Sequence, residues 1–361
     1  MNKPNLFDFA TSELSQDAFL CYLFSYVKEE YRENIKEYEF ANFILKELLK
    51  KCNLENLNIK SLEIKKQFYG IDILLIVNEK NFIIIEDKTN TNEREKQLER
   101  YKNKIKQYFS EKGIENLKTV YYKTGDEPLN NIKLKREYVD CVLMREDILS
   151  LMEKYEGNNI IINDYIDNLK NIQKSRENFK NKDLRSEILN WNEIHGFYNA
   201  LDKEFEKGIL PEGVNFNWEY VANPKGGFMS YFFPALLNFK TFSIYSQIEA
   251  SVVEYDDNLS DNKLSLNKER LKYVVKIHSY NKDSKLLYPI YNIFKNEWKE
   301  KFNIKKIKRF GHGYTMSILT IEEYLSLNEN GNINVKETAL NIVNFIKEIQ
   351  ELKEKFKDLE K

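Results

Sequence analysis

Charged side chains stand at the ends of two apolar runs that a short polar turn separates. Asp72 begins the first run, residues 71–77, and the second run ends at Glu86, Asp87 and Lys88. Side chains alternate along a strand, so Glu86 and Lys88 point to one face of a sheet and Asp87 points to the other. If the two runs form a hairpin, the Asp72 end of one strand lies beside the Glu86 end of the next.

This arrangement has the chemistry of a site for a divalent cation. Two carboxylates, Asp72 and Glu86, converge near the backbone carbonyl of Asp87, and oxygen ligands of this kind suit Mg²⁺ or Mn²⁺. A metal held there can neutralise a phosphodiester and lower the pKa of a bound water. The Lys88 ammonium can orient that water and share the charge of the transition state. The alternative is that these residues are polar strand ends that face solvent.

Two flanking helices can bring further polar groups to the same place. Helical spacing of apolar residues predicts a helix over residues 12–28, with Glu13 and Asp17 on one face near its start. Such carboxylates either complement the helix dipole or belong to the site. The helix expected after the second apolar run carries Gln97 and Tyr101 one turn apart, so both can face the strand ends.

The order of these residues resembles the PD-(D/E)xK nuclease superfamily, which has the restriction-endonuclease-like fold. The segments that carry the resemblance read FDFATSELSQDAFL, GIDILLIV, FIIIEDKTNT and QLERY, and they fall within about residues 5–145. By this resemblance Asp72, Glu86 and Lys88 are the catalytic D, E and K. Ile71 stands where many members have the proline, a position at which proline is often missing.

The resemblance also gives roles to residues of the flanking helices. Glu13 matches a glutamate on the first core helix that helps hold a metal directly or through water. Gln97 and Tyr101 are similar to the QxxxY motif of the RecB-like and lambda-exonuclease-like branches, which supports the positioning of DNA. The predicted catalytic residues are therefore Asp72, Glu86, Lys88, Glu13, Gln97 and Tyr101, and the predicted metal ligands are Asp72, Glu86, Glu13 and the backbone carbonyl of Asp87.

The activity that the resemblance implies is a Mg²⁺- or Mn²⁺-dependent deoxyribonuclease, a hydrolase that acts on phosphodiester bonds. Many families of this superfamily act in prokaryotic defence against foreign DNA, and that setting is the expected one. An RNA substrate is one alternative. A second alternative is a catalytically silent nuclease-fold module that binds nucleic acid or a protein partner, although the presence of all the expected catalytic side chains favours the enzyme.

Composition limits the class of protein. The 361 residues are 42% hydrophobic, which is enough to bury sizeable cores. The 56 basic and 57 acidic side chains nearly cancel, so any nucleic-acid contact must come from a local patch. Three separated cysteines without a CxxC pair predict core packing and a reducing compartment. No signal peptide and no run of about 20 apolar residues is visible, so we expect a cytoplasmic protein without a membrane partner.

The pattern of apolar residues predicts an α/β chain with two domains. Residues 1–185 are expected to form a central mixed sheet flanked by helices, with a helical extension. The resemblance implies that this sheet is a restriction-endonuclease-like core. Residues 186–209 are expected to form a connecting helix. Alternating aromatic and polar residues predict an α+β C-terminal domain of unknown role over 210–330. The amphipathic helix over 335–361 either docks on its own domain, which is favoured, or pairs with a partner helix, and a homo-oligomer through this helix or domain is the corresponding partner prediction.

Two other segments have competing interpretations. The aromatic residues from Phe216 to Tyr245 are more typical of a sheet core than of a stacking platform for bases. The glycines at Gly311 and Gly313 follow basic residues, and a glycine hairpin is favoured there over a phosphate-facing turn.

Overall fold

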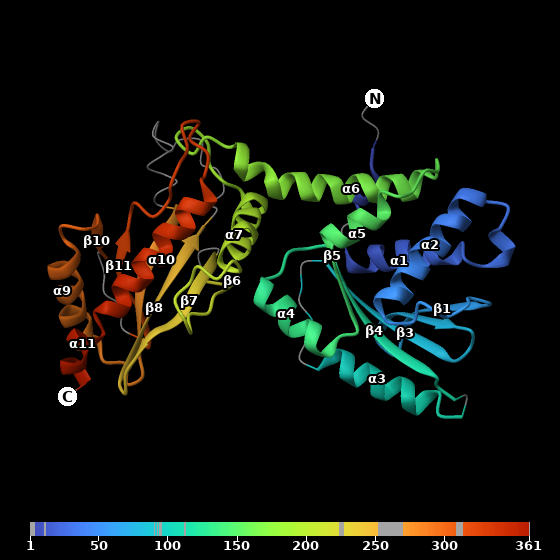
Figure 1. Cartoon of the computed structure of the whole chain (residues 1–361), viewed down its shortest axis with the longest axis horizontal. Coiled ribbons are helices and arrows are strands. Elements are labelled where there is room, and N and C mark those ends of the chain that lie inside the picture. The colour runs from blue at the N-terminus through green and yellow to red at the C-terminus, as the bar shows by residue number, and fades with distance from the viewer. Residues whose placement is uncertain are drawn as a thin grey trace. The chain divides into compact units, whose positions relative to one another are not determined.

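The computed structural model in Figure 1 shows a chain built from two compact units, each with helices around a sheet. The first unit comprises Met1–Glu127 and Asn131–Lys174, and the second comprises Pro128–Asn130 and Ser175–Lys361. The division between the units falls inside the helix α6 (Ile160–Glu177). The structure describes residues 4–10, 12–89, 91, 93, 96–111, 113–223, 227–251, 270–307 and 313–360.

A mixed sheet forms the centre of the first unit. Strands β1, β2 and β3 are antiparallel neighbours, and β3, β4 and β5 are parallel neighbours, so the spatial order follows the chain. Both β2 and β3 are buried along almost their whole length, which explains why their sequences are nearly continuous apolar runs. The strands are β1 (Leu62–Phe68), β2 (Ile71–Val77), β3 (Asn81–Lys88), β4 (Asn116–Lys123) and β5 (Cys141–Met144).

Helices cover both faces of this sheet, and Figure 1 shows α3 and α4 on one side with α1, α2 and α5 on the other. Ile83 and Ile85 of β3 pack in the core beneath α1 and α2, whereas Phe82 and Ile84 pack beneath α3. Even-numbered side chains of β3 therefore face α3, and this alternation places Glu86 and Lys88 on the α3 side. The helices are α1 (Glu13–Ser25), α2 (Ile35–Lys51), α3 (Gln97–Tyr108), α4 (Leu129–Tyr138) and α5 (Arg145–Met152).

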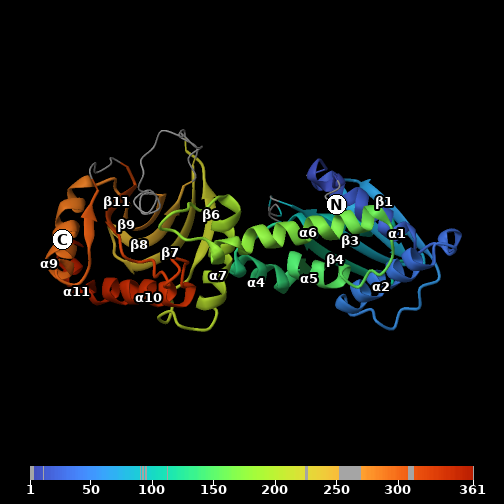
Figure 2. The same cartoon turned by 90° about the horizontal axis from the view of Figure 1, so that it is seen from above.

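The second unit contains an antiparallel sheet with the strand order β10-β11-β9-β8-β7-β6 in the described residues. Figure 2 shows α10 beside α7 along this sheet. The strands are β6 (Asn217–Val221), β7 (Phe228–Asn238), β8 (Phe242–Ala250), β9 (Leu271–Ser279), β10 (Ile304–Lys306) and β11 (Thr315–Ile321). The helices are α7 (Trp191–Phe205), α9 (Leu287–Trp298), α10 (Val335–Glu351) and α11 (Lys353–Phe356).

Short 3₁₀ helices complete the described elements of both units. They are η1 (Leu6–Asp8), η2 (Glu29–Tyr31), η3 (Asn178–Asn181), η4 (Ser284–Leu286) and η5 (Lys357–Glu360).

Helix α7 is the element found where the sequence predicted a connecting helix over residues 186–209. Its Phe197, Tyr198 and Leu201 are fully buried in the core of the second unit, so α7 is a core helix of that unit. The C-terminal helix α10 packs against α7 and β7. The α/β class is confirmed, with a mixed sheet in one unit, an antiparallel sheet in the other and helices flanking both.

Several aromatic residues of β6 and β7 lie in the core of the second unit. Trp218, Tyr231 and Phe233 are almost fully buried, as expected for a sheet core, whereas Tyr220 of β6 is 54% exposed. The glycine-containing basic segment is not described at residues 308–312.

None of the helices in the described part of the chain combines the length and the apolar surface that crossing a bilayer needs.

Candidate active site

The carboxylates of Asp72 and Glu86 meet at one end of the β2–β3 hairpin. The strands pair in register as far as Ile73 and Ile85, and one more step along the same register sets Asp72 opposite Glu86. Directly opposite residues of an antiparallel pair project from the same face. Lys88 projects from this face as well, and its ammonium lies 2.5 Å from Oε1 of Glu86 and 3.6 Å from Oδ2 of Asp72.

A backbone amide of β3 and a side chain of β1 hold Asp72 in place. Oδ2 of Asp72 accepts a hydrogen bond from the Asp87 amide at 3.0 Å, and its Oδ1 lies 3.4 Å from the donating side-chain amide of Gln67. The Asp87 carbonyl accepts from the Lys88 ammonium at 2.8 Å. This carbonyl, which the sequence indicated as a metal ligand, therefore faces the same space as the carboxylates.

Gln97 and Tyr101 form a chain of hydrogen bonds that ends on Glu86. The Gln97 side-chain amide donates to Oε1 of Glu86 at 2.6 Å and to the Tyr101 hydroxyl oxygen at 2.8 Å. The Tyr101 hydroxyl donates in turn to the Gly70 carbonyl at 2.5 Å. Since Gln97 begins α3, this chain ties the start of that helix to the β1–β2 turn and fixes the orientation of the Glu86 carboxylate.

Glu13, the first residue of α1, supplies the outermost carboxylate. Its Oε2 lies 3.8 Å from the Lys88 ammonium. Its Oε1 accepts from the Thr91 hydroxyl at 2.6 Å and from the Thr89 amide at 3.3 Å. The structure therefore brings all six predicted side chains, together with the Asp87 carbonyl, around one point at the ends of β2 and β3.

Burial sets the charge balance of this cluster. Desolvation raises the pKa of Glu86 to about 8, the charge of Asp72 adds to the shift, and the bond from Lys88 opposes it. Burial acts to lower the pKa of the Lys88 ammonium, but the bond and charge of Glu86, with the charges of Asp72 and Glu13, outweigh burial and raise it. One ammonium is thus surrounded by more than one carboxylate.

The donor set suits a divalent cation. Oε2 of Glu86 has no hydrogen-bond partner among the described residues although Glu86 is fully buried, and an orphaned carboxylate oxygen of this kind needs a proton or a cation. The described residues hold no ready-made centre of three or more acidic, histidine or cysteine ligands. Mg²⁺ is commonly bound by one or two carboxylates with several waters retained, and Asp72 and Glu86 are a pair of this kind.

Two buried carboxyls, Asp17 and Asp87, lie together behind the site, a pairing that the sequence did not predict although it indicated Asp17 as a possible site residue. Burial, helped by the charge of Asp72, raises the pKa of Asp17 to about 6, and burial raises that of Asp87 well above its usual range. Gln16 donates to Asp87, and Gln67 donates to Asp17 at 2.9 Å. A proton retained on Asp87 can be donated to Asp17, which gives a partner to two carboxyl oxygens that otherwise lack one. The only signal for this pair was the shared helix face of Glu13 and Asp17.

Sequence reasoning also missed Lys123, the register partner of Lys88 on β4. Lys123 is fully buried, and burial lowers the pKa of its ammonium to about 8. This ammonium donates to the Thr91 carbonyl at 2.5 Å. Thr91 also bonds Glu13, so Lys123 helps to hold the segment that follows β3 at the rim of the site.

Replacing Tyr101 by phenylalanine should lower the free energy of unfolding by about 1 kcal/mol, since the variant loses the hydroxyl that bonds both Gly70 and Gln97. Urea denaturation measures this change. Tyr108→Phe is the matched control, because Tyr108 lies on the same helix with its side chain 55% exposed. Equal stabilities of the two variants would show that the hydrogen-bond chain does not stabilise the unit.

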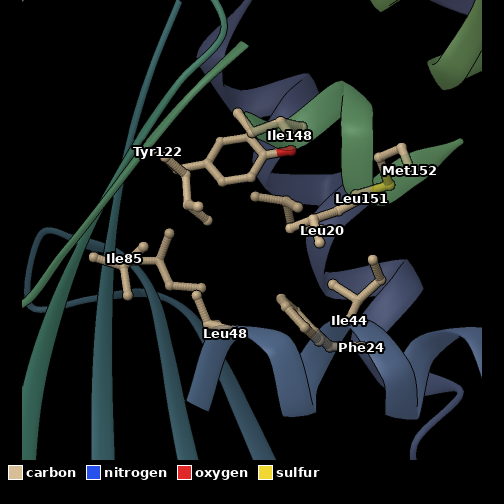
Figure 3. A pocket seen from close by; sticks show the side chains of 11 residues that line it. Leu20, Phe24, Ile44, Leu48, Ile85, Tyr122, Ile148, Leu151 and Met152 are labelled. Carbon is tan, nitrogen blue, oxygen red and sulfur yellow. The ribbon is translucent and has the colours of Figure 1, made fainter. Parts of the chain in front are cut away.

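The apolar pocket in Figure 3 is separate from this cluster. Its lining side chains come from α1, α2, α5 and the α1-facing side of the sheet, and they include Leu20, Phe24, Ile44 and Met152. The space measures about 20 Å³, close to what a single water needs. Such a small apolar space is a packing void, so it offers no binding site for a substrate.

Comparisons with known proteins give no family assignment. No protein-family model, no curated protein and no solved structure matches the chain. The geometry of the cluster and the chemistry of its residues therefore carry the functional argument.

Proposed function

We propose that the chain is a divalent-metal-dependent nuclease that hydrolyses phosphodiester bonds in DNA. The observation that carries the proposal is the convergence of Asp72, Glu86 and Lys88 at the end of one hairpin, with the Lys88 ammonium in contact with both carboxylates. A structural ion pair needs one carboxylate for one lysine. Here the ammonium faces two carboxylates, and the fully buried Glu86 keeps an oxygen that has no partner among the described residues, which a cation bound between Glu86 and Asp72 would explain.

The topology of the first unit supports the same proposal. An antiparallel β1–β2–β3 meander leads through α3 into the parallel strand β4, with α1 on the opposite face from α3. This arrangement resembles the core of the restriction-endonuclease-like fold, in which the catalytic residues lie on the two central antiparallel strands. Fold alone does not establish function, so the topology only adds to the argument from the site.

The side chains of the cluster have distinct roles in the proposed reaction. When bound, the metal would be held by Asp72 and Glu86 and would supply a water of lowered pKa and a positive charge beside the phosphate. The Lys88 ammonium stabilises negative charge that develops on the phosphate oxygens. Gln97 holds Glu86 in one orientation, and Tyr101 holds Gln97.

A cleavage assay with the purified full chain tests the proposal. Supercoiled, linear and single-stranded DNA and an RNA of the same sequence are incubated with Mg²⁺, with Mn²⁺ or with EDTA. We expect cleavage of DNA that needs the metal and that the Asp72→Asn variant, purified identically, lacks. Cleavage that persists in Asp72→Asn would come from a contaminant. Binding without cleavage of any substrate would reject the enzyme and favour the silent nucleic-acid-binding module.

A further inference from the structure

Three aromatic rings form a cluster next to the β1–β2 turn, in which Phe68 is partly buried against the core and the two tyrosines are exposed. Phe68 and Tyr69 come from the end of β1 and the turn that follows, and Tyr108 comes from the end of α3. The ring centroids lie 4.7 Å apart for Phe68 and Tyr69, 5.1 Å apart for Phe68 and Tyr108, and 5.2 Å apart for Tyr69 and Tyr108. Tyr69 is 57% exposed and Tyr108 is 55% exposed, so two large rings that touch each other are left open to solvent.

The backbone of the β1–β2 turn is strained where it presents Tyr69. Gln67 and Tyr69 have positive φ angles of 53° and 54°, and Gly70 follows with a φ of 84°. Glycine adopts this region at little cost, but a bulky side chain such as that of tyrosine does not. Strain of this kind is concentrated at functional sites, where the surrounding structure maintains it.

The same turn is bonded to the catalytic cluster. Tyr101 donates to the Gly70 carbonyl, and Gln67 donates toward Asp72. Tyr69 therefore stands next to the residues that fix Asp72 and the Gln97–Tyr101 pair.

Lysines supply positive charge around the rings. The Lys65 ammonium lies 5.4 Å from the centroid of the Phe68 ring and pairs with Glu63 at 2.5 Å, so its charge is partly compensated. The Lys104 ammonium donates to the Tyr69 carbonyl at 2.8 Å and lies 5.5 Å from the Tyr101 ring centroid. Because the whole chain has a net charge of −1, this local combination of lysines and exposed rings is the type of surface that nucleic-acid binding requires here.

We propose that Phe68, Tyr69 and Tyr108 form a stacking platform for an unpaired base of the DNA, so that the substrate is held as a single strand beside Asp72. This inference rests on the proposed nuclease function. Aromatic rings stack on the faces of bases, and those faces are available in single strands but are covered by neighbouring bases inside a duplex. Lysines beside the rings fit the phosphates of the same strand. A double-helical substrate would need contacts to the backbone and groove edges, and the exposed rings supply neither.

Binding measured without catalysis tests the platform. Fluorescence anisotropy follows a labelled single-stranded oligothymidylate, a duplex of the same length and an abasic strand, all in EDTA. The variants are the double Tyr69→Ala/Tyr108→Ala and, as the matched control, Tyr31→Ala, an exposed tyrosine of the same unit that is 38% exposed. We expect the double variant to bind the single strand about tenfold more weakly, with little change for the abasic strand or the duplex. Tyr31→Ala should bind like the wild type.

The outcomes separate the platform from the nuclease. Equal losses for the single strand and the abasic strand, or no loss at all, would overturn the stacking platform, and so would a wild-type protein that prefers the duplex. Because binding in EDTA needs no metal, a protein that shows the expected pattern but never cleaves DNA would keep the platform and reject the nuclease. If the double variant is not stably folded, the single variant Tyr108→Ala, at the exposed end of α3, replaces it in the same anisotropy measurements.

Discussion

Replacing Lys88 by methionine should lower the rate of metal-dependent DNA cleavage by about 10²- to 10³-fold, the range found when one charge-stabilising group is removed from an active site. Methionine keeps much of the length of the side chain and removes only its ammonium. That ammonium contacts Glu86, Asp72 and the Asp87 carbonyl in the structure. The loss should fall on kcat, because the ammonium acts on charge that develops in the transition state.

Lys118→Met is the matched control for this prediction. Lys118 lies on β4, and its ammonium lies 3.3 Å from Asp140, away from the cluster. Single-turnover cleavage with Mg²⁺ in excess measures both variants against the wild type. A Lys88→Met protein that retains a rate within about threefold of Lys118→Met would show that Lys88 is only a structural counter-ion of Glu86.

The local pattern of the sequence is enough to predict the elements that carry this lysine. Residues 71–77 are almost all apolar and lack the apolar–polar alternation of a half-exposed strand. Strand β2 has the same bounds as this apolar run, because both faces of the sheet are covered. The second apolar run continues at both ends as strand β3, since the polar Asn81 and the residues Asp87 and Lys88 also pair with β4. A prediction from apolar residues alone underestimates the length of a strand whose ends carry polar groups of the site.

Contacts between segments that are distant in the sequence cannot be predicted from the local pattern of apolar residues. Helix α4 (Leu129–Tyr138) has a weak apolar stripe, and it is held in part by the buried ion pair between Lys135 and Glu127. The partners of the Asp87 side chain lie on α1, far away in the sequence. From the sequence alone, Asp87 is therefore indistinguishable from an ordinary polar residue at the end of a strand. The left-handed conformation of Gln67 and Tyr69 violates the preference of both residue types, and only the surrounding fold maintains it.

Replacing Glu86 by glutamine should raise the free energy of unfolding at pH 8 by about 2–4 kcal/mol in the absence of metal. The native protein holds the Glu86 proton up to a pKa of about 8, whereas an unfolded chain releases it near the ordinary value of 4.5. Between these two values the native state binds more protons than the unfolded state. The wild type therefore loses stability as the pH rises from about 4.5 to about 8, and this slope disappears above that range.

Glutamine fits the hydrogen bonds around this position. Its carbonyl oxygen can accept from Gln97 and Lys88, as Oε1 of Glu86 does. Its amide nitrogen then replaces Oε2, the oxygen without a partner among the described residues, and has the charge of Asp72 nearby as an acceptor. The variant thus removes the buried charge without leaving a cavity, which is why a gain in stability is expected together with a loss of cleavage.

Asp140→Asn is the control, because it should change the free energy of unfolding at pH 8 in the opposite direction. Burial acts to raise the pKa of Asp140, but hydrogen bonds from Thr119 and Lys102 outweigh burial and hold that pKa below its usual value. The ionised Asp140 therefore stabilises the native state above the pKa of the unfolded chain, and its replacement should lower stability at pH 8 by about 1 kcal/mol. Thermal and urea unfolding at pH values from 5 to 9, at roughly one-unit intervals, measures both variants and the wild type.

The last part of this prediction concerns the effect of a divalent cation on the free energy of unfolding. A cation that binds the native carboxylates should stabilise the wild type at pH 8 by about 2.7 kcal/mol at a concentration one hundred times its dissociation constant. Glu86→Gln and Asp72→Asn should show much smaller shifts with Mg²⁺ or Mn²⁺, whereas Asp140→Asn should respond like the wild type. If metal stabilises all the variants equally, the cation binds elsewhere. If Glu86→Gln is less stable than the wild type at pH 8, the buried charge is compensated without metal, and the argument for a cation at Glu86 fails.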